Sequence, residues 1–144
     1  MRKHIAVFGS PSSGKTLFSF VLADALTKDQ KRVLIISPDD IIPILPMLED
    51  GKMGLGRLFL EEINQLHFTQ AVKVLRENPL VGVLGHGLQE EGIRDEAQME
   101  TFCSIAESLS DSIIWDLTSD MSNPFCQFAK KKAELSVCIL TPDK

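Results

Sequence analysis

The chain has 144 residues, of which 44% are apolar and 24% charged, and its formal net charge is −5 at pH 7. This length suits one domain with its own hydrophobic core, and the negative charge disfavours a constitutive nucleic-acid or anionic-membrane surface. No apolar run approaches the roughly 20 residues of a membrane-spanning helix. The three cysteines lie far apart without a CxxC pair, which disfavours a disulfide framework or a zinc site. We therefore expect a soluble, cytoplasmic protein.

Short apolar runs alternate with helical patterns along the chain. The runs that predict strands are 4–8, 32–37, 80–84, 112–117 and 135–140. The segments whose apolar spacing predicts helices are 16–28, 58–65, 68–77, 95–109 and 123–132. Strands that alternate with helices indicate stacked βαβ units. We expect an α/β fold in three layers, with a mainly parallel sheet of about five strands covered on both faces.

A phosphate-binding loop is predicted between the first strand and the first helix. The residues that match G-x-x-x-x-G-K-[ST] are Gly9, Ser10, Pro11, Ser12, Ser13, Gly14, Lys15 and Thr16. The glycines let the backbone turn its N–H groups toward phosphate oxygens, and the following helix adds its unpaired N–H groups and its dipole. Lys15 is expected to reach the β- and γ-phosphates, and the Thr16 hydroxyl to ligate Mg²⁺. The predicted ligand is ATP with magnesium.

Acidic residues end two of the predicted strands. Asp116 ends the apolar run Ile113–Trp115, where a P-loop protein places a carboxylate for its magnesium ion; the alternative is a strand-capping residue. Asp39 and Asp40 follow the second strand at the edge where parallel sheets bind ligands. One of them is predicted to orient an attacking water or to sense the γ-phosphate, and a solvated turn after the strand is an equal alternative.

With these residues placed, the chain resembles the MinD/ParA group of P-loop ATPases, in particular its CpaE- and TadZ-like members. The segments that carry the resemblance are the loop 9–16 and the runs 31–39, 111–116 and 133–142. The resemblance covers the whole chain and implies that 1–144 is one P-loop NTPase domain, lacking the C-terminal part of the family domain. In the family's D-x-D motif, Ser37 replaces the first carboxylate and Asp39 matches the second, which implies that Asp39 and Lys15 are catalytic.

One departure from the family pattern bears on hydrolysis. The family's loop reads K-G-G-x-G-K-T, and its first lysine reaches across an ATP-bound dimer, whereas this chain has Ser10 at that position.

Two functions remain open from the resemblance. One is an ATPase that switches between monomer and ATP-bound homodimer to recruit a protein partner, and the other is a nucleotide-binding scaffold that does not hydrolyse ATP.

Two further interpretations have weaker support in the sequence. A small-molecule kinase shares the loop and the sheet, but the five arginines are scattered and do not form a lid. Three consecutive lysines, Lys130–Lys132, could contact DNA or a membrane, although cations at the end of a helix are explained by its dipole.

Overall fold

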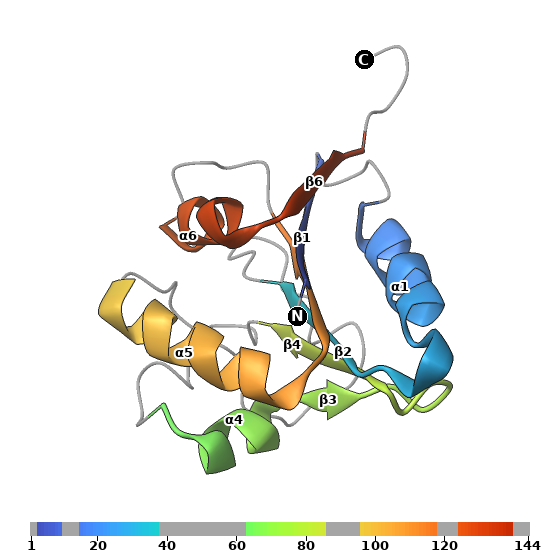
Figure 1. Ribbon diagram of the computed structural model, residues 1–144, viewed down its shortest axis with the longest axis horizontal. Coiled ribbons are helices and arrows are strands. Elements are labelled where there is room, and N and C mark those ends of the chain that lie inside the picture. Colours follow the sequence, from blue (N-terminus) through green and yellow to red (C-terminus); the bar gives the residue numbers. More distant parts are fainter. Residues whose placement is uncertain (1–2, 10–14, 38–62, 86–95, 118–123, 140–144) are drawn as a thin grey trace.

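The computed structural model describes residues 3–9, 15–37, 63–85, 96–117 and 124–139 (Figure 1). Its strands are β1 (Lys3–Phe8), β2 (Val33–Ser37), β3 (Lys73–Val74), β4 (Val81–Gly85), β5 (Ser112–Asp116) and β6 (Leu135–Cys138). Its helices are α1 (Lys15–Leu26), the 3-10 turn η1 (Lys28–Gln30), α4 (Gln65–Ala71), α5 (Glu96–Leu109) and α6 (Pro124–Lys132). The strands form one six-stranded sheet in the order β3-β4-β2-β5-β1-β6.

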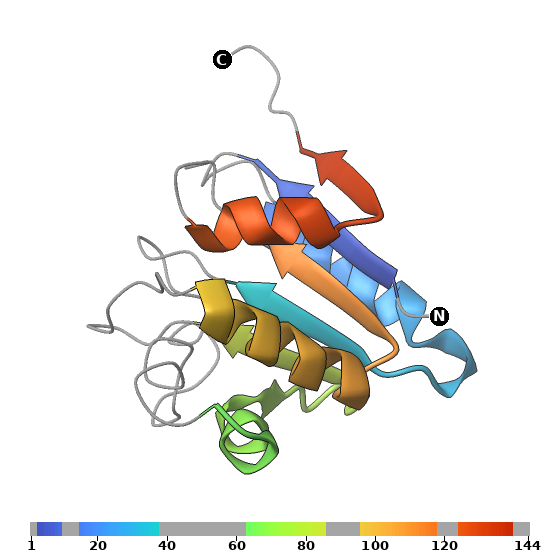
Figure 2. The same ribbon diagram turned by 60° about the vertical axis from the view of Figure 1, so that its left-hand side comes forward.

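Helices cover both faces of the sheet, which gives three layers (Figures 1 and 2). Helix α1 packs on one face, and α4, α5 and α6 pack on the other. Successive strand residues point to opposite faces, so Val33 and Ile35 of β2 join the core under α1, while Leu34 and Ile36 join the core under the other three helices. Because both faces are buried, the central strands are almost entirely apolar.

All strand pairs are parallel except β3 with β4, which is antiparallel. The expected α/β class, with three layers and a mainly parallel sheet, is therefore confirmed. Four of the five predicted strands agree with the observed ones to within one residue at each end, and β6 is shorter than its predicted range 135–140 by two residues. Within the described ranges, no helix combines the length and the apolar character needed to cross a bilayer.

The expected helix over 68–77 is present only over 68–71, and the structure has a sixth strand beyond it. Helix α4 begins at Gln65, where Asn64 Oδ1 accepts a hydrogen bond from the His67 backbone N–H, and it ends at Ala71. The chain then turns extended at Val72 and forms the two-residue strand β3 beside β4. Helical spacing extends over Phe68, Ala71, Val72 and Leu75. The chain nevertheless forms a hairpin, in which the Leu75 N–H donates to the Val81 carbonyl across the turn at 3.0 Å. The expected helix over 58–65 lies mostly outside the described residues.

Gly82 allows this hairpin to pack closely against the sheet. A Cβ atom at position 82 would lie 2.7 Å from Val72 Cγ1 and 3.5 Å from Leu34 Cδ1. The first distance is shorter than a real carbon contact, and valine has little rotamer freedom with which to move away. A side chain at this point of β4 would therefore force Val72 to move.

We predict that Gly82→Ala destabilises the protein by about 1–3 kcal/mol, the usual cost of overpacking a core. Urea unfolding would measure the change in free energy. If the clash with Val72 is the cause, the double variant Gly82→Ala/Val72→Ala will be more stable than the sum of the two single effects. Simple additivity of the two changes would contradict this explanation.

Candidate functional site

The carboxyl ends of β1 and β5 lie side by side, next to the first turn of α1. The two strands pair in parallel with Val7 opposite Asp116, and the Leu117 backbone N–H donates to the Val7 carbonyl at 2.9 Å. Gly9 follows β1 and is buried. Because α1 begins at Lys15, its N-terminus is close to the end of β5. A buried glycine, a helix N-terminus and a strand-ending carboxylate thus meet at one edge of the sheet.

The two residues predicted to hold magnesium are in direct contact. The Thr16 hydroxyl donates to Asp116 Oδ2 at 2.8 Å, although the residues are 100 positions apart. The Ser19 hydroxyl donates to Asp116 Oδ1 at 3.2 Å, so each carboxylate oxygen accepts a hydroxyl hydrogen bond. Asp116 has no exposed surface. Sequence reasoning missed Ser19, although its position three residues after Thr16 places it on the same face of α1.

These side chains fit a hard divalent cation in the type of donor they offer. Mg²⁺ prefers carboxylate, hydroxyl and water oxygens, usually with one or two protein ligands and phosphate oxygens completing its shell. Asp116 supplies a buried negative charge and Thr16 a hydroxyl oxygen at 2.8 Å from it. The N-terminus of α1 adds the positive end of a helix dipole, which favours phosphate. A bound magnesium ion would supply charge neutralisation for the phosphates of a nucleotide.

The other residues of the predicted site are placed only in part. Lys15 is the first residue of α1, as the loop pattern requires, and its side chain lies outside the described part. The predicted site residues that lie outside the described ranges are Ser10, Pro11, Ser12, Ser13, Gly14 and Asp39. Asp39 follows Ser37, the last residue of β2, by two positions. The roles of these residues stay predictions.

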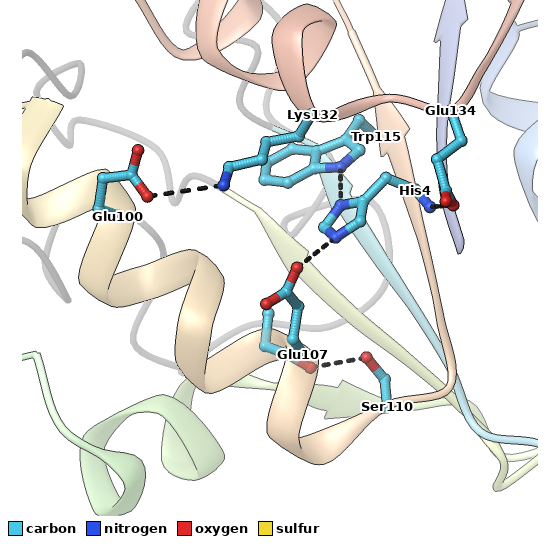
Figure 3. Close-up of polar contacts among 8 residues, drawn as sticks. His4, Glu100, Glu107, Ser110, Trp115, Lys132 and Glu134 are labelled. Carbon is cyan, nitrogen blue, oxygen red and sulfur yellow. Dashed lines mark hydrogen bonds and ion pairs between the residues drawn. The ribbon is translucent and has the colours of Figure 1, made fainter. Parts of the chain in front are cut away.

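A second polar cluster lies behind β5, on the side of the sheet that carries α5 and α6 (Figure 3). His4 of β1 is 5% exposed. Its Nδ1 atom lies 3.1 Å from the Trp115 indole nitrogen, and its Nε2 atom lies 2.7 Å from Glu107 Oε2. Because indole N–H can only donate, Nδ1 accepts and Nε2 carries the proton that is donated to Glu107. The imidazole is therefore a neutral ring in one tautomer that links β1, β5 and α5.

Cys103 completes a group that has the residue types of a metal site but not the chemistry of one. Three potential ligand atoms, one from each of His4, Cys103 and Glu107, lie within 4.8 Å of one another. Metal binding would need a free Nε2 lone pair, and here Nε2 donates to Glu107. It would also need a thiolate, whereas burial, reinforced by the nearby Glu107 carboxylate, raises the pKa of the Cys103 thiol to about 12. The cluster therefore holds α5 against the sheet through hydrogen bonds.

With this geometry in place, the molecule has the fold of P-loop ATPases of the MinD and ParA type. The chain is similar to a ParA family ATPase from Chlorobium tepidum, with 18% identity and a TM-score of 0.77 over 98% of this chain and 62% of that one. It is similar to the MinD cell division protein of Aquifex aeolicus, with 21% identity and a TM-score of 0.61 over 98% of this chain and 58% of that one. At these identities the likeness establishes the fold alone.

The same fold occurs in a protein with a different activity. The kinase domain of the Escherichia coli tyrosine kinase ETK matches with 14% identity and a TM-score of 0.72, over 99% of this chain and 57% of that domain. The chain thus spans less than two thirds of the length of each of these structures.

The sequence comparisons are more limited than the structural ones. A segment of 66 residues, 44% of the chain, is 36% identical to the Holliday junction branch migration complex subunit RuvB of Lactococcus lactis, and it spans 19% of that protein. No protein-family model matches the chain.

We predict that His4→Phe destabilises the fold by about 1–3 kcal/mol, because the substitution keeps a ring in place but removes both hydrogen bonds of the imidazole from a buried site. Urea unfolding of the variant and of the wild-type chain gives the difference. The matched control is Glu100→Gln, which removes an exposed ion pair with Lys132 at 3.6 Å and is expected to cost less than about 0.5 kcal/mol. Equal effects of the two substitutions would contradict a buried hydrogen-bonding role for His4.

The raised pKa of the Cys103 thiol predicts a loss of stability at alkaline pH. The folded thiol keeps its proton up to a pKa of about 12, whereas the ordinary value is 9.0. Between these values the unfolded chain binds fewer protons than the folded one, so stability falls as pH rises. One pH unit above the unfolded pKa, the loss is about 1.4 kcal/mol. Urea unfolding at pH 8 and pH 10, compared between wild type and Cys103→Ser, measures this contribution.

The control for this titration is Cys138→Ser, because Cys138 is an exposed thiol on β6. The Cys138 variant is expected to lose as much stability between the two pH values as the wild-type chain. The Cys103 variant is expected to lose less. An identical loss in all three proteins would show that another group causes the alkaline destabilisation.

Proposed function

We propose that residues 1–144 form the P-loop NTPase domain of a cytoplasmic ATP-dependent switch of the MinD/ParA type. The domain binds ATP with Mg²⁺, dimerises around the bound nucleotide and recruits a protein partner in that state. The observation that carries this proposal is the contact between Thr16 and the buried Asp116 at the N-terminus of α1. Sequence reasoning assigned Thr16 to magnesium from the loop pattern, and assigned Asp116 from its place at the end of a strand in a chain that carries that loop.

Each site residue has a defined role in this proposal. The backbone of residues 9–16 cradles the phosphates, and Lys15 neutralises the β- and γ-phosphate charge. Thr16 and Asp116 hold the magnesium ion, while Ser19 keeps the carboxylate oriented through its hydrogen bond to Oδ1. Asp39, two positions beyond the end of β2, orients the water that attacks the γ-phosphate.

The alternative is a scaffold that binds ATP and dimerises without hydrolysing it. Ser10 favours this alternative, because it stands where the family has the lysine that completes the active site across the dimer. Both functions share the nucleotide site, and they differ only in the release of phosphate.

We predict that this chain binds ATP in the presence of Mg²⁺ and that Lys15→Ala weakens binding at least about tenfold, because a charge-assisted hydrogen bond to phosphate contributes about 1.5–3 kcal/mol. Isothermal titration calorimetry with the wild type, Lys15→Ala and the control Lys130→Ala measures the affinities. Lys130 is an exposed lysine in the last turn of α6, and its removal is expected to leave the affinity unchanged.

The magnesium assignment is tested in the same titration. For the wild type, replacing Mg²⁺ by a chelator is expected to weaken ATP binding. For Asp116→Asn the affinity is expected to be low and nearly independent of Mg²⁺, because an amide carries no charge to attract the ion. Thermal unfolding without nucleotide checks that Asp116→Asn still folds. A full magnesium effect in this variant would remove Asp116 from the metal site.

Light scattering and phosphate release then separate the two functions. A switch forms dimers with ATP and Mg²⁺ and releases phosphate, whereas a scaffold forms dimers without releasing phosphate. If ATP binds without any change in mass, the dimerisation proposal fails although the nucleotide site stands.

A further inference from the structure

A pocket lies at the edge of the sheet opposite the Thr16–Asp116 contact. Its volume is about 270 Å³, and it opens between α4 and the amino-terminal ends of β2 and β4. The residues that form its floor and walls are Leu34, Phe68, Val72, Leu80, Gly82 and Leu109. These elements come from four separate parts of the chain and meet in the lower part of Figure 1. The pocket has no residue in common with the nucleotide site.

The apolar lining of the pocket is preformed, because Leu34 and Phe68 belong to the hydrophobic core. Leu34 and Gly82 face each other in the register of β2 and β4. Phe68 is fully buried, and its ring packs against Phe102 with 5.0 Å between centroids. Gly82 lacks a side chain, and a Cβ there would already contact Leu34 and Val72. An apolar ligand would therefore meet preformed apolar walls, as small-molecule sites usually provide.

The residues that line the pocket include one cationic residue. Arg32 is the single charged residue among the described residues that line the pocket. Its backbone is held in place, since its N–H donates to Asp111 Oδ2 at 2.9 Å and its carbonyl accepts from the Asp111 N–H at 2.8 Å. Over the described ranges, no acidic side chain pairs with the Arg32 guanidinium. Arg32 is an exposed residue of this lining, and a guanidinium carries five N–H donors that a ligand can use.

The hydroxyls in the lining offer no comparable donor. The Thr69 hydroxyl donates to the Gln65 carbonyl at 2.8 Å, and the Ser110 hydroxyl donates to the Ala106 carbonyl at 2.7 Å. Recognition of a polar ligand group therefore falls to Arg32, whose planar guanidinium matches a carboxylate with two parallel hydrogen bonds. The pocket is suited to a molecule with one anionic end and an apolar body.

The volume limits the size of that body. A cavity of about 270 Å³ corresponds to roughly nine times the 30 Å³ that one water molecule occupies in the liquid. A ligand of about ten non-hydrogen atoms fits this space. We propose that the pocket binds a small apolar monocarboxylate of this size, with its carboxylate on Arg32 and its hydrocarbon part on Leu34, Phe68 and Gly82.

Octanoate has the proposed size and charge and serves as the probe. Isothermal titration calorimetry and methyl NMR with the full chain are expected to show binding, with shifted signals from Leu34, Val72, Leu80 and Leu109. Arg32→Gln is expected to weaken octanoate binding at least about tenfold, because it removes a charge-assisted bidentate contact. The matched control is Arg76→Gln, an exposed arginine that does not line the pocket. Its affinity is expected to equal that of the wild type.

A neutral analogue, a size series and a blocking variant complete the test. Octanol is expected to bind more weakly than octanoate to the wild type and to be indifferent to Arg32→Gln. Affinity is expected to rise from butanoate to octanoate and not to rise further for hexadecanoate. Thr69→Phe adds bulk at an exposed lining position and is expected to reduce octanoate binding without affecting the fold.

Three results would overturn the proposal. They are methyl shifts located elsewhere, equal weakening by Arg32→Gln and Arg76→Gln, and octanol binding as tightly as octanoate. Binding of ATP to Arg32→Gln is expected to be unchanged. The pocket proposal can therefore fail while the nucleotide-binding proposal stands, and the reverse is also true.

Discussion

The burial of the Asp116 carboxylate constrains how α1 lies against the carboxyl end of β5. A charged group with no exposed surface must have hydrogen-bond donors, and two of them are the hydroxyls of Thr16 and Ser19. These two residues are almost one turn apart on α1, so their joint contact sets both the rotation of the helix and its position along β5. The same turn is the N-terminus of α1, where unpaired N–H groups and the helix dipole attract anions. One buried interaction thus aligns a metal-binding carboxylate with a phosphate-binding helix end.

The part of the fold that holds this site could be predicted from sequence because its signals are local. The apolar runs of β1, β2 and β5 are short, continuous and bounded by polar residues, which is the pattern of strands buried on both faces. The loop pattern and the apolar spacing after it predicted a helix over 16–28, and α1 is described over Lys15–Leu26. Asp116 could be chosen as a metal-binding candidate because it ends an apolar strand run in a chain with a phosphate-loop pattern. The structure places its carboxylate 2.8 Å from the Thr16 hydroxyl.

Other features could not be predicted, because they depend on contacts between distant residues. His4 lies in an apolar strand pattern, and nothing near it in sequence indicates that Glu107 and Trp115 complete its hydrogen bonds from 103 and 111 positions away. The helical spacing after Phe68 was misleading because the antiparallel pairing of β3 with β4 overrides local preference. The pocket beside Arg32 is another long-range feature, since its lining comes from α4, α5 and the edges of three strands.

Consecutive residues of β5 connect the two helical layers of the molecule. Trp115 points toward α5 and α6, and its indole N–H donates to His4 Nδ1. The ring centroids of Phe102 and Phe128 lie 6.5 and 6.4 Å from that of Trp115. Asp116 points to the opposite face, toward α1. Because neighbouring side chains of a strand share one backbone, the packing of Trp115 also limits the movement of Asp116. The fold is shared with both ATPases and a kinase domain, so it does not by itself decide the chemistry. The chemistry depends on the side chains at the carboxyl edge of the sheet, where β5 places Asp116 against the first turn of α1.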